Sequence, residues 1–423
     1  MKFHFHCGLL ERLIEVQGMH SINKLKCTLI SVFTLFCSMS SNAATIEMTA
    51  VFRPDPSKPM HNVFQNTTPQ SGHCKDHPNY CEEGVFSIGV PIRFRSVAPF
   101  LPMHDERQGP MFRVPSSWKE LNVTHDVTGE TETVRMRVVG IGGAYTVKLP
   151  FPEGMWNRPW GYAPAPCLHG GVAYASPYFY AFFWKVPPNA GTCAKQAIQL
   201  IPETYGFAYQ DLTFSYELET PQPLKMSSGT YRGVLSYSVG PHKEFDMGDI
   251  MLPDDDVIQL DFALNVEHTL KVDIPPGGNS VVLEPKGGWQ SWLQAGRKPV
   301  RLFRDQTFNI SASSRFKMHL MCGHSTVYDQ CGLYSIEARR MIGIYVSVSL
   351  PNGLTDMAGQ PVRQMRLLPG EANALQFQPG FYVDRAPGVL HFEMPPQRVE
   401  EMLRPPVGQR YRGSVTVIWD SDV

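Results

Sequence analysis

Two short stretches combine histidine and cysteine at spacings that a zinc ion can use. The candidate ligands are His73, Cys74, His77 and Cys81 in the first stretch, and His319, Cys322, His324 and Cys331 in the second. In an exported protein such cysteines more often form disulfides, and the neighbouring histidines then only decorate the loop. We therefore expect disulfides at both places and no metal site.

The stretch 156–162 gathers side chains that could recognise a sugar. Trp156, Trp160 and Tyr162 could stack on the apolar faces of a sugar ring. Asn157 and Arg158 could hydrogen-bond to hydroxyl or carboxylate groups. Proline and glycine around them indicate a loop, where recognition residues usually lie. The alternative is that the rings cover the end of a hydrophobic core.

Two pairs of arginines could bind an acidic sugar or a sulfate group. Arg93 and Arg95 share one face of a predicted strand, as do Arg135 and Arg137 of another. Paired guanidinium groups suit a carboxylate or a sulfate. The alternative, which we favour, is that both pairs lie on a solvated outer face.

No catalytic motif accompanies these candidates. The sequence contains no G-x-S-x-G elbow, no H-E-x-x-H motif and no phosphate-binding loop. Carboxylates are plentiful, but nothing in one sequence pairs them across a cleft. We therefore expect a protein that is not an enzyme and needs no cofactor.

Charge and composition limit the class of protein further. The formal net charge is −1 and the pI is about 6.9, so no overall field attracts nucleic acid or an anionic membrane. Hydrophobic residues make up 43% of the chain and charged residues 18%, which is typical of a globular protein. We expect no nucleic-acid partner.

The first 44 residues resemble an export signal. Lys24 and Lys26 precede the apolar run 27–39, and the small residues of 41–44 offer a cleavage site. The run is too short to span a bilayer comfortably. We expect translation to start at Met19 and residues 1–44 to form the signal-peptide region.

The cysteine count agrees with export. Of the nine cysteines, Cys7, Cys27 and Cys37 lie in the segment that we expect to be removed. The remaining cysteines are even in number, which implies disulfides, although counting alone leaves many connectivities open. Their grouping favours sequential pairs: Cys74–Cys81, Cys167–Cys193 and Cys322–Cys331.

The elements that must position these residues are β-strands. From Thr45 onward, short apolar or alternating runs are separated by proline, glycine, asparagine and aspartate. Helical periodicity is nearly absent. The sequence predicts an all-β protein.

Two stretches, each near the end of one half of the chain, share a strand pattern. Tyr231–Val239 and Tyr411–Val423 both begin Tyr-Arg-Gly and continue with alternating apolar residues. Each follows another alternating strand, 212–218 or 389–394, and a proline-containing loop. The repeat predicts two related β-sandwich modules in which that loop crosses from one sheet to the other. We place the boundary at the polar, aspartate-rich break near 248–256, giving modules 45–250 and 251–423.

The export signal, the two sandwich modules, the remaining cysteines and the terminal Tyr-x-Gly-x-Val-x-Val strand together resemble chaperone–usher fimbrial subunits. The two-domain tip adhesins are the most similar group. The resemblance implies tandem immunoglobulin-like sandwiches, a receptor-binding module 45–250 and a pilin module 251–423 that lacks its last strand. In the pilin module, the edge that accepts a strand from another chain would include Tyr411, Gly413, Val415, Val417 and Trp419.

The resemblance also implies partners and a location. A periplasmic chaperone would first fill the open edge by strand addition, with the carboxylate of Val423 near its basic anchor, and the adjacent pilin subunit would later replace it. The outer-membrane usher would export the chain through the periplasm to the fimbrial tip on the cell surface. There it would bind a host glycan or glycoprotein.

Two alternatives stay open. Thr45–Phe52 alternates well, so it is either the first strand of the first sandwich, which we favour, or a donor strand for another subunit. In the second case the protein would be an adaptor within the fibre. The opposing functional class is a secreted carbohydrate-active β-sandwich enzyme.

Overall fold

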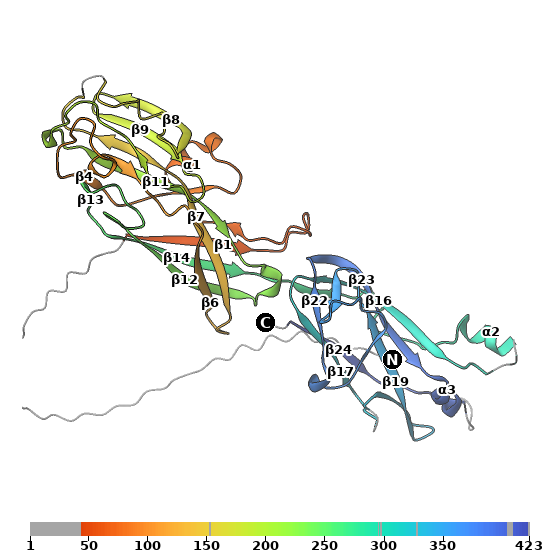
Figure 1. Cartoon of the computed structure of the whole chain (residues 1–423). Coiled ribbons are helices and arrows are strands. Elements are labelled where there is room, and N and C mark those ends of the chain that lie inside the picture. Colours follow the sequence, from red (N-terminus) through yellow and green to blue (C-terminus); the bar gives the residue numbers. More distant parts are fainter. Residues whose placement is uncertain are drawn as a thin grey trace, which may run out of the picture.

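The computed structural model describes residues 44–421, except 152–153, 295, 297, 327–328 and 404–408. The expected export signal and the carboxylate of Val423 lie outside the described residues. Figure 1 shows two bodies joined in tandem. One hydrophobic core runs from Met48 to Val266 and a second from Val281 to Val417. We call these bodies the N-terminal module and the C-terminal module. Strands dominate both, which confirms the predicted all-β class.

The strands of the N-terminal module are β1 (Ala44–Phe52), β2 (Gln65–Asn66), β3 (Phe86–Gly89), β4 (Phe94–Ser96), β5 (Met111–Phe112), β6 (Lys119–His125), β7 (Thr131–Thr146), β8 (Leu168–Ser176), β9 (Phe179–Lys185), β10 (Cys193–Ala194), β11 (Ala208–Glu219), β12 (Gly229–Ser238), β13 (Met251–Pro253) and β14 (Val257–Val266). The short helix α1 covers His73–Asp76, and single 3-10 turns cover Pro78–Tyr80, Glu106–Gln108, Glu203–Tyr205 and Pro223–Lys225.

One twelve-stranded sheet forms most of this module, in the order β13-β4-β11-β7-β6-β12-β14-β1-β2, with β3, β8 and β9 paired beside it. The expected crossing between sheets is absent here, because β11 and β12 belong to the same hydrogen-bonded sheet. Their connection passes over β7 and β6 instead.

The N-terminal module ends with strand β14. It pairs with β12 on one side and, in parallel, with β1 on the other. Its alternate residues Ile258, Leu260, Phe262, Leu264 and Val266 are buried in the first core. The expected boundary at 250 is therefore too early, because this alternating strand belongs to the first sheet and the chain passes to the second module between Val266 and Leu270. β1 is the strand 45–52 of the sequence analysis, and it is paired within its own chain.

The C-terminal module is a sandwich of two sheets. Its strands are β15 (Leu270–Asp273), β16 (Leu302–Ala312), β17 (Phe316–Cys322), β18 (Cys331–Ser335), β19 (Arg340–Ser349), β20 (Leu354–Asp356), β21 (Met365–Leu367), β22 (Leu375–Pro379), β23 (Val383–Met394) and β24 (Val415–Ser421). Helices α2 (Gly288–Gln294) and α3 (Pro396–Met402) and a 3-10 turn at Glu371–Asn373 complete it. One sheet has the order β15-β16-β23-β19-β18 with β21 beside β19, and the other β20-β22-β17-β24. Here the chain does change sheets between β23 and β24, as the repeat predicted.

Three disulfides fasten the fold, with the pairing expected from the cysteine grouping: Cys74–Cys81, Cys167–Cys193 and Cys322–Cys331. The third joins the end of β17 in one sheet of the C-terminal module to the start of β18 in the other. Within the described part of the chain, no helix has the length and apolarity needed to cross a membrane.

Candidate functional site

The last strand, β24, lies at the border of its sheet. It pairs antiparallel with β17 from Val415↔Cys322 to Ser421↔Phe316, and no other described strand pairs with its second side. Val415 and Val417 are buried, because alternate residues point into the core. Trp419 follows on the same face but is only partly buried. The backbone of β24 therefore offers donors and acceptors for one more strand.

The segment before β24 explains the glycine of the repeated motif. Arg412 forms a β-bridge with Tyr334, so this segment runs beside β18. A Cβ atom on Gly413 would lie 2.6 Å from the carbonyl oxygen of Gly332. Tyr411 is half-buried against the second core. Of the predicted edge residues, Val415, Val417 and Trp419 lie on the border strand, and Tyr411 and Gly413 lead into it.

A second unpaired strand edge borders the same core. β15 pairs only with β16 among the described strands. Its apolar residues Leu270 and Val272 pack against the core but stay partly exposed. The rings of Phe308 on β16 and Trp419 on β24 are in edge contact, with centroids 5.6 Å apart, so the β15–β16 margin lies opposite β24. The two sheets thus place the edge strands β15 and β24, each paired on one side only among the described strands, at this margin of the sandwich.

The repeated strand in the N-terminal module has no such free edge. β12 pairs with β14 from Gly229 to Ser238 and with β6 at Tyr231 and Arg232. Tyr231 is fully buried, and its hydroxyl donates a 2.5 Å hydrogen bond to Glu130. The two copies of one motif therefore stand in different surroundings: one has neighbours on both sides and one does not.

The aromatic stretch 156–162 is only partly a surface. Trp160 is fully buried, and Trp156 packs half-buried against the same core, with the two ring centroids 5.4 Å apart. Trp160 therefore cannot touch a receptor, and this part of the prediction is wrong. Its ring instead packs on those of Tyr145 and Phe182. An isolated sequence cannot show which rings of an aromatic loop turn inward.

The rest of that stretch is exposed, and a buried lysine holds it in place. Asn157, Arg158 and Tyr162 face solvent. The ammonium group of Lys195, itself buried, donates hydrogen bonds to the carbonyl oxygens of Arg158, Pro159 and Tyr162. Burial lowers the pKa of Lys195 to about 8, with a smaller effect from Arg158. The loop shape thus depends on a residue that the motif did not include.

Several of the other sequence candidates have structural partners. Arg135 and Arg137 form ion pairs with Glu219 and Glu217 on β11. His73 is buried, with its ring stacked on Phe183 at 3.5 Å between centroids. All the histidine-flanked cysteines are in disulfides, and the described residues contain no group of three ligands that could hold a metal.

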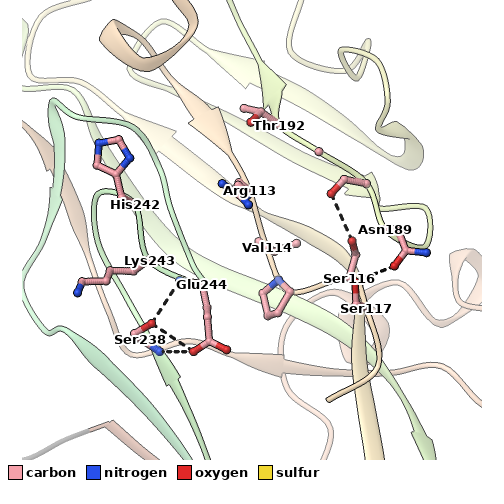
Figure 2. Close-up of a pocket in the computed structure, with 13 residues that line it drawn as sticks. Arg113, Val114, Ser116, Ser117, Asn189, Thr192, Ser238, His242, Lys243 and Glu244 are labelled. Atoms are coloured by element: carbon pink, nitrogen blue, oxygen red, sulfur yellow. Dashed lines mark hydrogen bonds between the residues drawn. The ribbon is translucent and has the colours of Figure 1, made fainter. Parts of the chain in front are cut away.

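A pocket of about 660 Å³ lies where three loops of the N-terminal module meet. Figure 2 shows Arg113 and Ser116 between the loop of Asn189 and Thr192 and the loop of His242 to Glu244. The guanidinium group of Arg113 makes no ion pair with any described residue, whereas Glu244 is held by Lys119 at 2.6 Å. With Arg113 and Lys243 at its rim, the pocket could hold a small anion.

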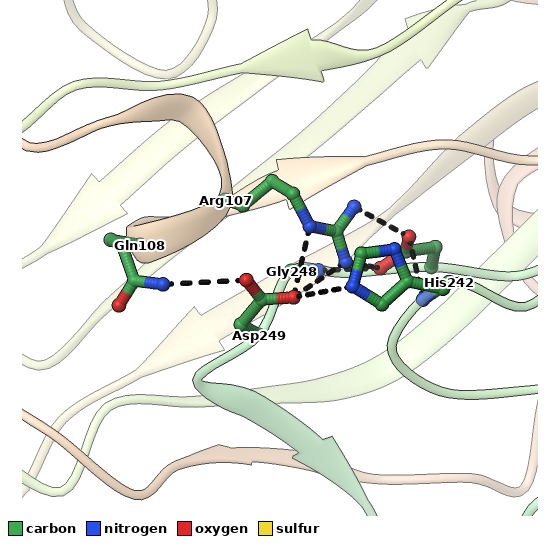
Figure 3. A network of polar contacts seen from close by, with 6 residues as sticks. Arg107, Gln108, His242, Gly248 and Asp249 are labelled. Atoms are coloured by element: carbon green, nitrogen blue, oxygen red, sulfur yellow. Dashed lines mark hydrogen bonds and ion pairs between the residues drawn. The ribbon is translucent and has the colours of Figure 1, made fainter.

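The loop that carries His242 is fixed by a buried ion pair. Arg107 donates to the carboxylates of Asp246, which is fully buried, and of Asp249. Figure 3 shows the Arg107 guanidinium group facing Asp249 and His242. Asp246 also accepts hydrogen bonds from the backbone nitrogens of His242 and Gly248. The hydrogen bonds from Arg107 to the Asp246 and Asp249 carboxylates raise the pKa of Arg107 and keep its guanidinium group charged. No sequence motif marked this network, because its members come from two distant loops.

Comparison with known proteins finds similar solved structures of fimbrial adhesins. The chain is similar to a chaperone–tip adhesin complex of CFA/I fimbriae at 11% identity and a TM-score of 0.25, covering 90% of this chain and 97% of that chain. It is similar to CfaE, the adhesive subunit of CFA/I fimbria of enterotoxigenic Escherichia coli, at 10% identity and a TM-score of 0.24, covering 89% and 98%. It is similar to the CsuC–CsuE chaperone–tip adhesion subunit complex of Acinetobacter baumannii at 8% identity and a TM-score of 0.20, covering 89% of this chain and 98% of that chain. No family model and no curated protein matches the chain.

Proposed function

We propose that this chain is the adhesive tip subunit of a chaperone–usher fimbria. One observation carries the proposal: the border strand β24 of the C-terminal sandwich pairs with β17 on one side only among the described strands, whereas the same motif in the N-terminal module is paired on both sides. An unpaired edge beside partly exposed core residues promotes aggregation unless another strand covers it. Strand addition by a periplasmic chaperone, and later by the adjacent pilin subunit, would supply that cover.

The N-terminal strand supports the tip position. A subunit within the fibre must give its first strand to a neighbour. Here β1 pairs with β14 from Ala44 to Phe52 and buries Met48, Ala50 and Phe52 in its own core. Removing it would open the N-terminal module. We therefore place the chain at the end of the fibre, exported through the usher to the cell surface, and favour a tip adhesin over an adaptor.

The N-terminal module would then bind the host receptor, and the protein would not be an enzyme. The predicted receptor loop is reduced to Asn157, Arg158 and Tyr162, because the two tryptophans turn toward the core. A shallow surface of this kind suits recognition by stacking and hydrogen bonds.

Hydrogen exchange tests the assembly proposal directly. The mature chain is co-purified with the periplasmic chaperone from its own fimbrial operon and compared with the chain refolded alone. We expect the backbone amides of β24 to gain protection in the complex, while those of β12 serve as a matched control and stay unchanged. A chain that is soluble and monomeric alone, with β24 already protected, would contradict strand addition.

A further inference from the structure

A groove on the outer face of the N-terminal sheet carries two exposed tyrosines. It has a volume of about 760 Å³ and lies over β4, β7, β8 and β11. Tyr174 is 57% exposed and Tyr178 is 51% exposed, and both line the groove. The Tyr174 ring is supported from one side by Phe179, with centroids 5.6 Å apart. A supported, exposed ring is ready to stack on a ligand at little entropic cost.

A β-bulge aims two polar side chains into the same groove. Gln210 pairs with Ala144 and Thr213 with Gly142, so Asp211 and Leu212 together stand opposite Gly143. Leu212 turns into the core, which lets both Gln210 and Asp211 face outward. Bulges often redirect side chains next to binding sites.

The backbone at the bulge is constrained to keep that arrangement. Asp211 has a φ of 50°, in the left-handed region that non-glycine residues seldom adopt. Gly143 opposite it has a φ of 143°, and a Cβ atom there would lie 2.8 Å from the carbonyl oxygen of Asp211. A conformation of this kind costs free energy and is often found at functional sites.

The groove contains equal numbers of positive and negative side chains, and these have no described ion-pair partner. Arg95 and Lys148 stand against Asp211 and Glu203, two cations and two anions. None of these four side chains makes a hydrogen bond or an ion pair with any residue that the structure describes. They can therefore both donate to and accept from a ligand, with no net charge to attract an ion.

We infer that this groove binds a short, uncharged oligosaccharide. Sugars present apolar faces that tyrosine rings can stack on and hydroxyl groups that are both donors and acceptors. The pocket beside Arg113 fits this chemistry less well, because its described lining has no tyrosine, tryptophan or phenylalanine and its one aromatic ring is the imidazole of His242. The inference rests on the proposed adhesive function and moves its site from the 156–162 loop to the groove.

A glycan array tests this inference on the whole mature chain in complex with its chaperone. The array carries neutral, sialylated and sulfated oligosaccharides. We expect binding to neutral glycans, with affinity at least tenfold lower in Tyr174→Ala, Tyr178→Ala and Asp211→Asn. Tyr174→Phe keeps the ring and should lose less than Tyr174→Ala. The matched control is the double variant Arg113→Ser and Lys243→Ser, which should bind neutral glycans as the wild type does.

The other outcomes separate the two proposals. Binding only to acidic glycans, abolished by the Arg113 and Lys243 changes, would overturn the groove assignment and keep the adhesive function. No binding to any glycan would overturn the inference, while protection of β24 by the chaperone would still support the fibre role. Equal melting temperatures of the variants would show that lost binding is not lost folding, since both tyrosines lie on the surface.

Discussion

At the scale of single residues, the buried ion pair of Arg107 is the most consequential polar contact in the N-terminal module. Asp246 has no exposed surface, and its carboxylate would be costly to bury without a cation. The same carboxylate holds the backbone at His242 and Gly248. One arginine thus determines the shape of the loop that borders the pocket of Figure 2.

Removing that arginine should destabilise the chain measurably. We expect Arg107→Met to lower the free energy of unfolding by about 3 kcal/mol, because it leaves the buried Asp246 carboxylate without its cation. Gln108→Ala is the matched control: Gln108 donates one exposed 3.3 Å hydrogen bond to Asp249, so its loss should cost under about 0.5 kcal/mol. Urea unfolding measures both, and equal effects would contradict the importance of the ion pair.

Burial of His73 should make stability depend on pH. Burial, with a smaller effect of His77, lowers the pKa of His73 to about 4 from an ordinary value near 6.5. The folded state therefore favours the neutral ring, and stability present above pH 6.5 is lost as the pH falls toward 4. At pH 5 the loss should be about 2 kcal/mol relative to pH 7.5.

The variant His73→Phe isolates this effect, because phenylalanine does not titrate and can keep the stack on Phe183. Urea unfolding at pH 7.5 and pH 5 should show a larger loss for the wild type than for the variant, since all other titrating groups are shared. Identical pH dependence of the two proteins would rule out His73 as the source.

At the scale of elements, a disulfide and a β-bridge link the two sheets of the C-terminal sandwich in addition to their shared core. The Cys322–Cys331 disulfide joins β17 to β18, one strand from each sheet. Beside it, the bridge between Arg412 and Tyr334 brings the chain before β24 to the other sheet. Both links lie beside the start of β24, since Cys322 pairs with Val415 and Arg412 precedes it in the chain.

Removing this disulfide should weaken the C-terminal module. The chain-entropy model gives about 3 kcal/mol for a loop of this length. We expect Cys322→Ala combined with Cys331→Ala to lower the free energy of unfolding of that module by this amount, measured in the chaperone-free chain by urea titration with hydrogen exchange of the β17 amides as the readout. An unchanged midpoint would mean that packing of the shared core holds the two sheets together without the disulfide.

At the scale of the whole molecule, two cores of unequal completeness share one chain. They meet at His268, whose ring contacts Phe52 and hydrogen-bonds to the Met226 carbonyl at 2.9 Å and to the Ser313 hydroxyl at 3.1 Å. Burial lowers the pKa of His268. The junction is thus small, and each core contains its own set of buried residues.

We therefore expect two calorimetric transitions, with the C-terminal module melting first because the edge of β24 lacks a second strand partner among the described residues. A C-terminal extension carrying an alternating apolar strand should raise only the lower transition, since it covers that edge. The same extension with its apolar residues changed to serine is the control. One cooperative transition, unmoved by the extension, would contradict a separate, incomplete C-terminal sandwich.

The sequence by itself determined the local features of this protein. Alternation predicted the strands and cysteine grouping predicted the disulfides. The repeated Tyr-Arg-Gly motif predicted two modules, each with a crossing between sheets, and only the C-terminal module has that crossing. These features depend on residues close together in the chain, so period and spacing are enough to predict them.

Only the tertiary structure decided which surfaces are available. It placed Trp160 in the core and β14 in the N-terminal module, and it left β24 with one described strand neighbour while its repeat β12 has two. It also joined the bulge at Asp211 with Tyr174 in one groove. The physical reason is that strand partners and converging loops come from distant parts of the chain, and no local pattern encodes which of them meet.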